Sequence, residues 1–281
     1  MIRLEYLAPP PDLCAYISAY YLFETDETDF ADIERADIAQ LRAFVLGGGT
    51  MTYPSGESYN SLPLSLFGPR LRASRFVLNG PVKLFGVGLL PAGWSALTKL
   101  SAAHYVDKLF DASEILGVDS LNAVMMLGKM KTLAEMAEAM NAVARRFEAR
   151  AEKVPHWFIR AVDDWLEQRV TPDIADLEKA TGLSRRQIDR MTKHIYGAAP
   201  KLLQRKYRAL RTARAIANGG GDWQDFIDEA YYDQSHCIRE IKQFVGITPR
   251  AIKDNASPLS SLTLGRHQLA GEVAALSAQS Q

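Results

Sequence analysis

The hydrophobic and polar positions follow one pattern in the first hundred residues and another in the rest of the chain. In the first part, short apolar runs are separated by the turn signals GGG, YPSG, FGP and NGP. The clearest of these runs are residues 43–46, 76–78 and 83–90. Short apolar runs bounded by glycine and proline are typical of β-strands. This part of the chain is therefore predicted to be β-rich.

From about Leu97 to Arg150 the apolar positions recur with helical spacing, in stretches rich in alanine, methionine and leucine. Methionines at this spacing indicate packing between helices rather than ligands. Pro155 cannot continue a preceding helix and marks a boundary. We therefore expect a β-rich N-terminal domain with a helical extension over residues 1–154.

After Pro155 the pattern predicts a series of short helices. Phe158, Val162 and Trp165 fall on one face of the first helix. Later helices begin with a Ser, Thr or Asp cap or with a proline, and the expected starts are Asp173, Ser184, Pro200, Asp222, Asp233 and Thr248. We expect an all-α domain over residues 155–256 and a small, polar, flexible tail over 257–281. The expected fold class is α+β.

The helical part repeats itself after a shift of 49 residues. The matched pairs are Arg190 with Arg239, Lys193 with Lys242, Gly197 with Gly246, Pro200 with Pro249, Lys201 with Arg250, Asp173 with Asp222 and Asp176 with Asp225. Two copies of one supersecondary unit explain these matches better than chance. Each copy is a short helix, a tight turn and a second helix. The sequence therefore predicts two helix-turn-helix units joined by a long helix from about Pro200 to Ala217.

The second helix of each copy has an apolar face and a polar face. The apolar stripes are Ile188, Met191 and Ile195 in the first copy, and Cys237, Ile241, Phe244 and Val245 in the second. The polar faces carry Arg186, Asp189, Arg190 and Lys193 in the first copy, and Gln234, Ser235, Ile238, Arg239 and Lys242 in the second. A helix-turn-helix places the N-terminal part of its second helix in the major groove, where Gln can read adenine and Arg guanine. The polar DQSH segment is therefore predicted to be the leading turn of a recognition helix.

Charge and length agree with DNA as the partner. The chain carries 33 basic and 33 acidic residues, so its total charge indicates no partner. Within residues 184–214, however, ten basic side chains accompany only Asp189. Such a run is often a solvated helix face, and the alternative is that Lys201, Arg205 and their neighbours follow phosphates. The joining helix would span roughly 27 Å, close to the roughly 34 Å between successive major grooves on one face of DNA.

The residues of the two copies together resemble the twin helix-turn-helix module of the AraC/XylS transcription regulators. The likeness covers roughly residues 156–254 and rests on the LSR start of the first reading helix, the DQSH segment and the FVGITP ending. It implies base-facing positions at Arg186, Asp189 and Arg190 in the first unit, and at Gln234, Ser235, His236 and Arg239 in the second. The chain departs from the family pattern at Ala230, Cys237 and Ile241, where a turn glycine and two phenylalanines are usual. Loss of that glycine leaves open whether the second unit reads bases.

The N-terminal half resembles, more weakly, a domain that often precedes this module. The likeness rests on PPPDLCAYISAYYLFE near the start, on FGPR and on VKLFGVGLLPAGWSAL. It implies sensing or dimerisation and names no ligand. If an apolar pocket exists among the strands, its candidate walls are Tyr53, Phe67, Phe85 and Trp94, and the alternative is that these aromatic residues are core.

We expect a sequence-specific DNA-binding transcription regulator whose recognition helices, about 184–196 and 233–245, enter successive major grooves. The expected DNA-binding residues are Arg185, Arg186, Asp189, Arg190, Lys193, Lys201, Arg205, Gln234, Ser235, His236, Arg239 and Lys242. The expected partner is double-stranded DNA. RNA polymerase, a small-molecule effector and a second copy of the chain are further candidates, whereas a cofactor, a metal and a membrane are not expected. A partly decayed, non-DNA-binding interaction protein on the same fold is the main alternative.

An enzyme is the more remote alternative. Only His104 of the five histidines lies in the first 154 residues, GGG at 47–49 lacks the downstream GK(S/T) of a phosphate loop, and no serine or cysteine has a base partner by sequence. Cys14 and Cys237 form no CxxC pair, which suits a reducing cytoplasm. The start of the chain lacks the pattern of a signal peptide, and we expect a cytoplasmic protein.

Overall fold

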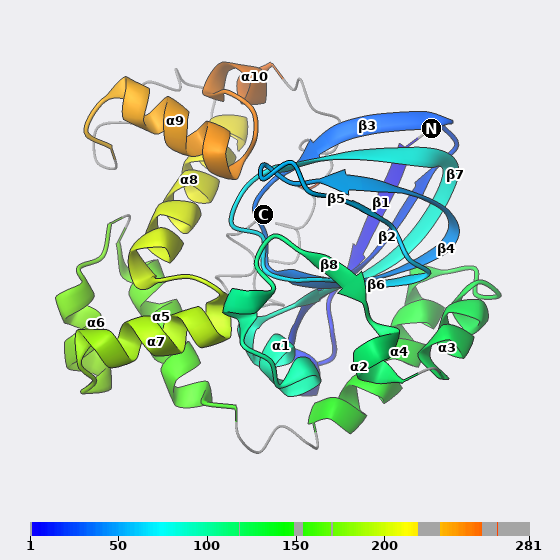
Figure 1. The fold of residues 1–281 in the computed structure, drawn as a ribbon, viewed down its shortest axis with the longest axis horizontal. Helices are drawn as coiled ribbons and strands as arrows, with labels where there is room; N and C mark the ends of the chain where they lie inside the picture. Colours follow the sequence, from blue (N-terminus) through cyan, green and yellow to red (C-terminus); the bar gives the residue numbers. More distant parts are fainter. Residues whose placement is uncertain are drawn as a thin grey trace.

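The computed structural model describes residues 2–117, 119–148, 154–169, 171–218, 231–254 and 263. In these residues it confirms the mixed α+β class, with one antiparallel sheet of eight strands beside a group of helices (Figure 1). The strands are β1 (Ile2–Leu7), β2 (Ile17–Thr25), β3 (Asp29–Glu34), β4 (Ala39–Thr52), β5 (Ser58–Asn60), β6 (Leu64–Phe67), β7 (Ser74–Leu89) and β8 (Leu109–Asp111). Their order is β1-β2-β7-β4-β6-β8, while β3 pairs with β7 and β5 with β4.

The sheet curls because its two longest strands each serve two sets of partners. The first half of β7 pairs with β3 and with the end of β4, and its second half pairs with β2 and with the start of β4. The register between β4 and β7 shifts on both sides of Leu46. Gly47 lies at this irregularity with a φ of +68°, and a Cβ there would collide with the carbonyl oxygen of Pro81. Glycine therefore permits the close approach of the two strands at the bend.

Each face of the curled sheet has its own hydrophobic core. One face packs against α1 (Pro91–Thr98), α3 (Asp119–Leu127) and α4 (Leu133–Glu148), and its core includes Tyr20, Phe85, Trp94 and Met136. The opposite face encloses a second core that includes Phe23, Phe30, Tyr53, Phe67 and Phe76. The prediction of a helical pattern from about Leu97 to Arg150 was wrong in part. Strand β8 interrupts it because β8 pairs with β6, and α2 (Ser113–Leu116) follows as a single turn.

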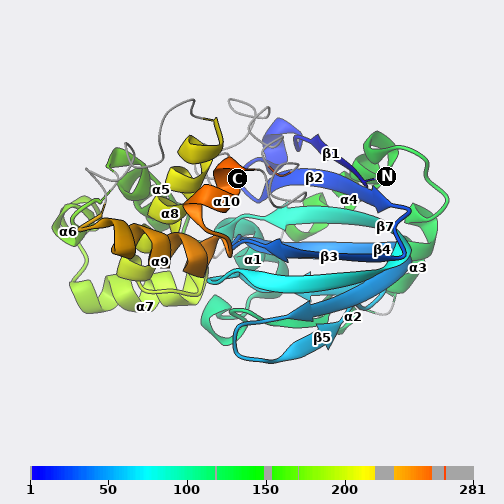
Figure 2. The same cartoon turned by 90° about the horizontal axis from the view of Figure 1, so that it is seen from above.

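The remaining helices lie beside one end of the sheet (Figure 2). They are α5 (His156–Gln168), α6 (Ile174–Thr181), α7 (Arg185–Tyr196), α8 (Pro200–Asn218), α9 (Gln234–Phe244) and α10 (Pro249–Lys253). The predicted starts are confirmed at Asp173, Asp233 and Thr248, whose side chains accept backbone N–H groups of the first turn. At the start of α7, Gln187 Oε1 accepts from the backbone N–H of Ser184 at 2.9 Å. The predicted start at Asp222 and the predicted tail over 257–281, apart from Thr263, lie outside the described residues.

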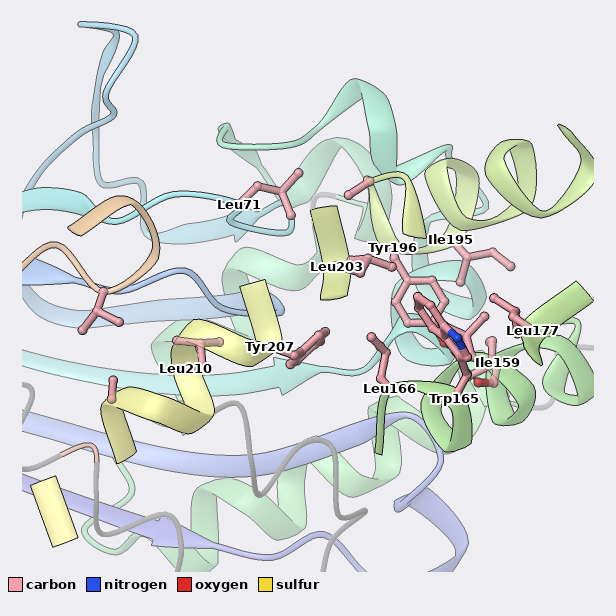
Figure 3. Packing of buried hydrophobic residues seen from close by; sticks show 14 of the residues in the cluster. Leu71, Ile159, Trp165, Leu166, Leu177, Ile195, Tyr196, Leu203, Tyr207 and Leu210 are labelled. Atoms are coloured by element: carbon pink, nitrogen blue, oxygen red, sulfur yellow. Dashed lines mark hydrogen bonds between the residues drawn. The ribbon is translucent and has the colours of Figure 1, made fainter. Parts of the chain in front are cut away.

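The helices share one hydrophobic core. Figure 3 shows Trp165, Leu177, Tyr196, Tyr207 and Leu210 within it. Leu71, from the loop before β7, belongs to the same cluster, so this core extends to the edge of the sheet (Figure 3). Within the described residues, no helix combines the length and hydropathy that a bilayer crossing requires.

Candidate nucleic-acid interface

Of the two predicted recognition helices, α7 comes before α8 in the chain and α9 lies beside α8 (Figures 1 and 2). Each buries the apolar stripe that the sequence predicts. In α7, Ile188 and Ile195 are buried and Met191 packs partly against them. In α9, Cys237, Ile241 and Phe244 are buried, and Val245 follows them at the end of the helix. The polar face of each helix is therefore turned away from the protein core.

The exposed face of α7 is basic. Arg185, Arg186, Arg190 and Lys193 are exposed there, and Asp189 is half-buried. Lys193 Nζ lies 2.7 Å from Asp189 Oδ2, one helical turn away. Both partners of this pair are substantially exposed, so the pair contributes little stability and leaves Lys193 able to exchange partners.

The exposed face of α9 begins with Gln234 and Ser235 and continues with Arg239 and Lys242. Arg239 and Lys242 stand at the positions that Arg190 and Lys193 occupy in α7 after the 49-residue shift, and all four side chains are exposed. The exposed parts of the two helices therefore carry the same pair of long cationic side chains at the same spacing.

His236 differs from the other predicted base-facing residues because it is half-buried and turned along its own helix. Its Nε2 lies 3.2 Å from Glu240 Oε1, and its Nδ1 lies 3.5 Å from the backbone nitrogen of Tyr232. Its ring also packs edge-on against Tyr231. The imidazole thus ties the first turn of α9 to its second turn.

The basic run divides into exposed and internal side chains. Lys201 is exposed, whereas Lys206 and Arg208 on α8 are buried. Arg205 Nε donates to Glu240 Oε1 at 2.6 Å, and Arg211 Nη1 donates to the carbonyl oxygen of Leu166 at 2.7 Å. Part of the run therefore stabilises contacts within the protein, and the exposed part is Arg185, Arg186, Arg190, Lys193 and Lys201.

Sequence reasoning missed Glu240, the acidic residue that organises these internal cations. Its side chain is 1% exposed and accepts hydrogen bonds from Arg205 and Arg208 of α8. Burial by itself would raise the pKa of Glu240, but the hydrogen bonds from the two guanidinium groups outweigh burial and hold the pKa below its ordinary value. The sequence near Glu240 contains one indication of the cluster, the i,i+4 spacing of His236 and Glu240. The two arginines could not be found from local spacing, because they lie on another helix.

The C-terminal end of α9 is bound to loops of the sheet. The backbone N–H of Ala36 donates to Phe244 O at 2.7 Å, and that of Ala73 donates to Gln243 O at 3.0 Å. Gly246 follows α9 with a φ of +93°, and a Cβ there would collide with Ile33. Near this contact, Lys206 of α8 donates from Nζ to Asp37 O at 2.8 Å. The leading turn of α9 is exposed while its far end is fixed to the sheet.

A cavity lies on the inner face of the sheet, next to the loop that contacts α9. Its apolar wall includes Leu4, Phe23, Phe44, Phe67, Phe76, Leu78 and Leu84, and its polar wall includes Tyr21, Glu34, Asp37, Gln40 and Arg42. Of the four aromatic residues that the sequence suggested, Phe67 lines this cavity. Trp94 and Phe85 belong instead to the core on the opposite face of the sheet, and Tyr53 is buried in the core around the cavity without lining it.

The polar wall of the cavity is a network of charges. Glu34 pairs with both Arg42 and Arg70, and Arg70 is fully buried. Burial by itself would raise the pKa of Glu34, but the two guanidinium groups outweigh it and lower the pKa. The guanidinium of Arg42 also stacks on Phe67, with 4.5 Å between its central carbon and the ring centroid. The cavity therefore combines an apolar body with a fixed, charged end.

No group of three or more histidine, cysteine or carboxylate side chains able to hold a metal ion occurs among the residues that the structure describes.

No protein-family profile and no curated protein matches the chain. Among solved structures, ToxT from Vibrio cholerae in a 1.65 Å crystal form has 7% identity and a TM-score of 0.48, over 84% of this chain and 96% of that one. An apo form of a single-substitution variant of ToxT, from Vibrio cholerae strain SCE256, has 9% identity and a TM-score of 0.47, over 84% and 97%. The AraC-like transcriptional activator CuxR has 12% identity and a TM-score of 0.33, over 80% and 86%. At these values the likeness establishes neither a family nor a function.

Proposed function

We propose that this protein is a sequence-specific DNA-binding transcription regulator of the AraC/XylS type, which inserts α7 and α9 into successive major grooves. The observation that supports this most directly is the equivalence of the two exposed faces. Arg190 and Lys193 on α7 correspond to Arg239 and Lys242 on α9, and all four are exposed while both apolar stripes are buried. A structural helix pair has no need of two matching exposed cationic faces.

The length of α8 supports the spacing of the two helices. Its 19 residues correspond to about 28 Å of helix at about 1.5 Å per residue. Successive major grooves on one side of DNA are about 34 Å apart. This length is of the same order as one turn of DNA, and α7 precedes α8 while α9 packs beside it.

The exposed side chains divide into two roles. Arg190, Gln234, Ser235 and Arg239 stand on the leading parts of the two helices and are proposed to contact base edges. Asp189 lies on the same face of α7 as Arg190, and Lys242 lies on the same face of α9 as Arg239. The remaining exposed cations, Arg185, Arg186, Lys193 and Lys201, are proposed to contact phosphates. His236 and Arg205 are proposed to support the reading surface from within, because their donors already face Glu240.

The cavity on the inner face of the sheet is proposed to bind a small-molecule effector. Its polar wall includes Glu34 and Asp37, and between them in sequence lies Ala36, whose N–H holds the end of α9. A molecule that displaces this wall would move the segment that holds α9. RNA polymerase, and a second copy of the chain, complete the proposed set of partners of a cytoplasmic regulator.

Selection of bound sequences from random double-stranded DNA, at two salt concentrations, tests the proposed function. We expect enrichment of two half-sites about one helical turn apart, with an affinity that falls steeply with salt, by about 0.9 in log–log slope per phosphate contact. A single enriched half-site would favour a partly decayed second unit. An absence of enrichment at both salt concentrations would favour an interaction protein on the same fold.

A further inference from the structure

Glu240 lies on the second recognition helix, but it does not face the same direction as the exposed reading side chains. Its Oε1 accepts from Arg205 Nε at 2.6 Å, and its Oε2 accepts from Arg208 Nη2 at 2.6 Å and from Arg208 Nε at 3.1 Å. His236 Nε2 approaches Oε1 to 3.2 Å. A single carboxylate with an exposure of 1% is thus surrounded by Arg205, Arg208 and His236, which come from two helices. We call these four residues the Glu240 cluster.

The cluster is a two-point attachment of α9 to α8. Arg205 and Arg208 are three residues apart on α8, so they project from the same face one turn apart. Each oxygen of the carboxylate is held by a different arginine, which fixes the direction of the carboxylate as well as its position.

Both arginines also reach beyond Glu240 to other parts of α9. Arg205 Nη2 donates to Gln243 Oε1 at 3.3 Å, one turn further along the helix. The guanidinium of Arg208 stacks on Tyr231, just before the helix, with 4.9 Å between its central carbon and the ring centroid. The attachment therefore extends from the segment that leads into α9 to its last turn.

The first recognition helix has no equivalent of this cluster at the corresponding positions, all of which the structure describes. Shifting Glu240 back by 49 residues gives Met191, which packs against the apolar core of the helices. In the same way, the position equivalent to Arg208 is Ile159, a buried apolar residue. Helix α7 is therefore seated by apolar packing at these positions, whereas α9 is seated by charge.

We propose that Glu240 is the positioning residue of the second recognition helix. It fixes the rotation of α9 about its own axis relative to α8. Because α8 also follows α7, this orientation sets the spacing on DNA between the half-site that α9 contacts and the half-site that α7 contacts. Arg205 acts through Glu240 rather than on a phosphate, and His236 transmits the same restraint to the leading turn that bears Gln234 and Ser235. This role rests on the proposed DNA-binding function.

Binding of the full-length protein to a set of DNA duplexes tests the role. Each duplex carries the two half-sites selected by the wild-type protein, with the spacing between them changed by −1, 0 or +1 base pair. Wild-type protein is expected to prefer the native spacing. Glu240→Gln keeps the size of the side chain and one acceptor oxygen but removes the charge, and is expected to reduce this preference by about fivefold or more, since charge-assisted hydrogen bonds to arginine are roughly twice as strong as neutral ones.

Two further variants separate positioning from direct contact. Lys201→Ala removes an exposed cation and is expected to weaken binding equally at all three spacings. Arg205→Ala removes half of the attachment and is expected to flatten the spacing preference without lowering the salt slope. Its effect should largely disappear when it is combined with Glu240→Gln, because both changes remove the same pair.

Retention of the wild-type spacing preference in Glu240→Gln would overturn the role of Glu240. A salt slope that falls by about 0.9 in Arg205→Ala would overturn the role of Arg205, because that slope reports a direct phosphate contact. If Glu240→Gln does not fold, Arg205→Ala decides the question alone, since Arg205 is partly exposed and its loss leaves Arg208 on the carboxylate. Failure of the proposed function is recognised separately, because the wild-type protein would then enrich no half-sites.

Discussion

Tyr196 of α7 and Asp163 of α5 share a hydrogen bond that connects the first proposed recognition helix to the core. Tyr196 Oη lies 2.8 Å from Asp163 Oδ1 and 3.1 Å from the carbonyl oxygen of Ile159. One hydroxyl proton cannot fully serve two acceptors. If Asp163 is protonated, its own proton bonds to Tyr196 Oη, and the tyrosine hydroxyl is free to donate to Ile159 O. The geometry therefore favours the neutral acid.

The titration of Asp163 gives the first prediction. Burial raises the pKa of Asp163 to about 7, against a smaller lowering by the hydrogen bond from Tyr196. Because the folded state binds this proton more tightly than the unfolded state, the stability contributed by the neutral acid is lost as pH rises from about 4 to about 7. Asp163→Asn remains neutral throughout. At pH 8 we expect the variant to be more stable than the wild type by on the order of 2 kcal/mol. This is less than the full pKa shift would give at about 1.4 kcal/mol per pKa unit, because Asp163 is only partly buried and solvent screens its charge.

Urea unfolding at pH 5, 7 and 8.5 measures this difference. The gap between Asp163→Asn and the wild type should be small at pH 5 and largest at pH 8.5. Parallel pH profiles for the two proteins would show that Asp163 titrates in the folded state as it does in the unfolded chain.

The second prediction concerns Lys206, which is buried between α8 and the sheet. Burial lowers the pKa of Lys206 to about 8, partly offset by the charge of Asp37. The unfolded state then binds the proton more tightly between about pH 8 and 10.5, so this group adds stability as pH rises through that window. Lys206→Met should abolish the rise. It should also be neutral or stabilising at pH 7, by up to about 3 kcal/mol, because replacing a buried charge by an apolar side chain is often favourable.

The carbonyl oxygen of Asp37 makes this substitution interpretable. It accepts from Lys206 Nζ at 2.8 Å and also from the backbone N–H of Arg70 at 3.1 Å, so it keeps a partner in the variant. Denaturant titrations at pH 7, 8.5 and 9.5 provide the test. A clear loss of stability in Lys206→Met at pH 7 would mean that the hydrogen bond outweighs the cost of burying the charge.

Local signals made the helices predictable from the sequence. The caps at Asp173, Asp233 and Thr248 and the apolar stripes of α7 and α9 depend on residues within about one or two turns of each other, and the structure contains them. The repeat of 49 residues likewise placed Arg190 and Arg239 on equivalent exposed positions.

Long-range packing was not predictable in the same way. Helix α8 looks basic in sequence, but Lys206 and Arg208 are buried because they meet Asp37 and Glu240 from distant parts of the chain. Strand β8 lies in a region with helical spacing, and its pairing with β6 determines its structure. Whether an aromatic residue such as Phe67 or Phe85 faces the cavity depends on strand register and on which face of the sheet the helices cover.

The third prediction concerns the cavity in the sheet. A ligand that binds only the folded state increases the free energy of unfolding, by about 2.7 kcal/mol at a hundredfold excess over Kd, and therefore raises the melting temperature. Thermal-shift screening with small apolar and aromatic metabolites should find such a ligand. Met51→Trp enlarges a buried side chain of the cavity lining and should abolish the shift. Thr52→Trp, the next residue along the strand, lies on the opposite face and outside the lining, and should leave the shift intact. No stabilisation across a broad panel would favour a purely structural core.

The fourth prediction uses the exposed lysine at the start of α8. Lys201→Ala should weaken binding to all DNA sequences by a similar factor and reduce the salt slope by about 0.9, since it removes one phosphate contact and no base contact. Equilibrium binding to a selected and a random duplex, each at several salt concentrations, gives both quantities. A change confined to the selected duplex would instead assign Lys201 to base recognition.

The last prediction concerns Arg239 and Arg190, the corresponding exposed arginines of the two proposed recognition helices. If both helices read DNA, each Arg→Ala change should remove one base-edge contact, cost about 1–3 kcal/mol of binding and relax the preference at one position. The two relaxed positions should lie about one helical turn of DNA apart. Both variants should fold normally, because an exposed arginine contributes little packing.

If the second unit no longer contacts bases, the two variants are expected to differ in their effect on the selected DNA sequence. Ala230, which stands where the AraC/XylS pattern has a turn glycine, lies outside the described residues. The effect of each variant on the selected DNA measures the fit of α9 in a groove. Site selection repeated with each variant makes that measurement. If Arg190→Ala relaxes one position and Arg239→Ala leaves the selected sequence unchanged, only α7 reads bases. If each variant relaxes its own position, the charged seating of α9 on α8 presents Arg239 to DNA as effectively as apolar packing presents Arg190.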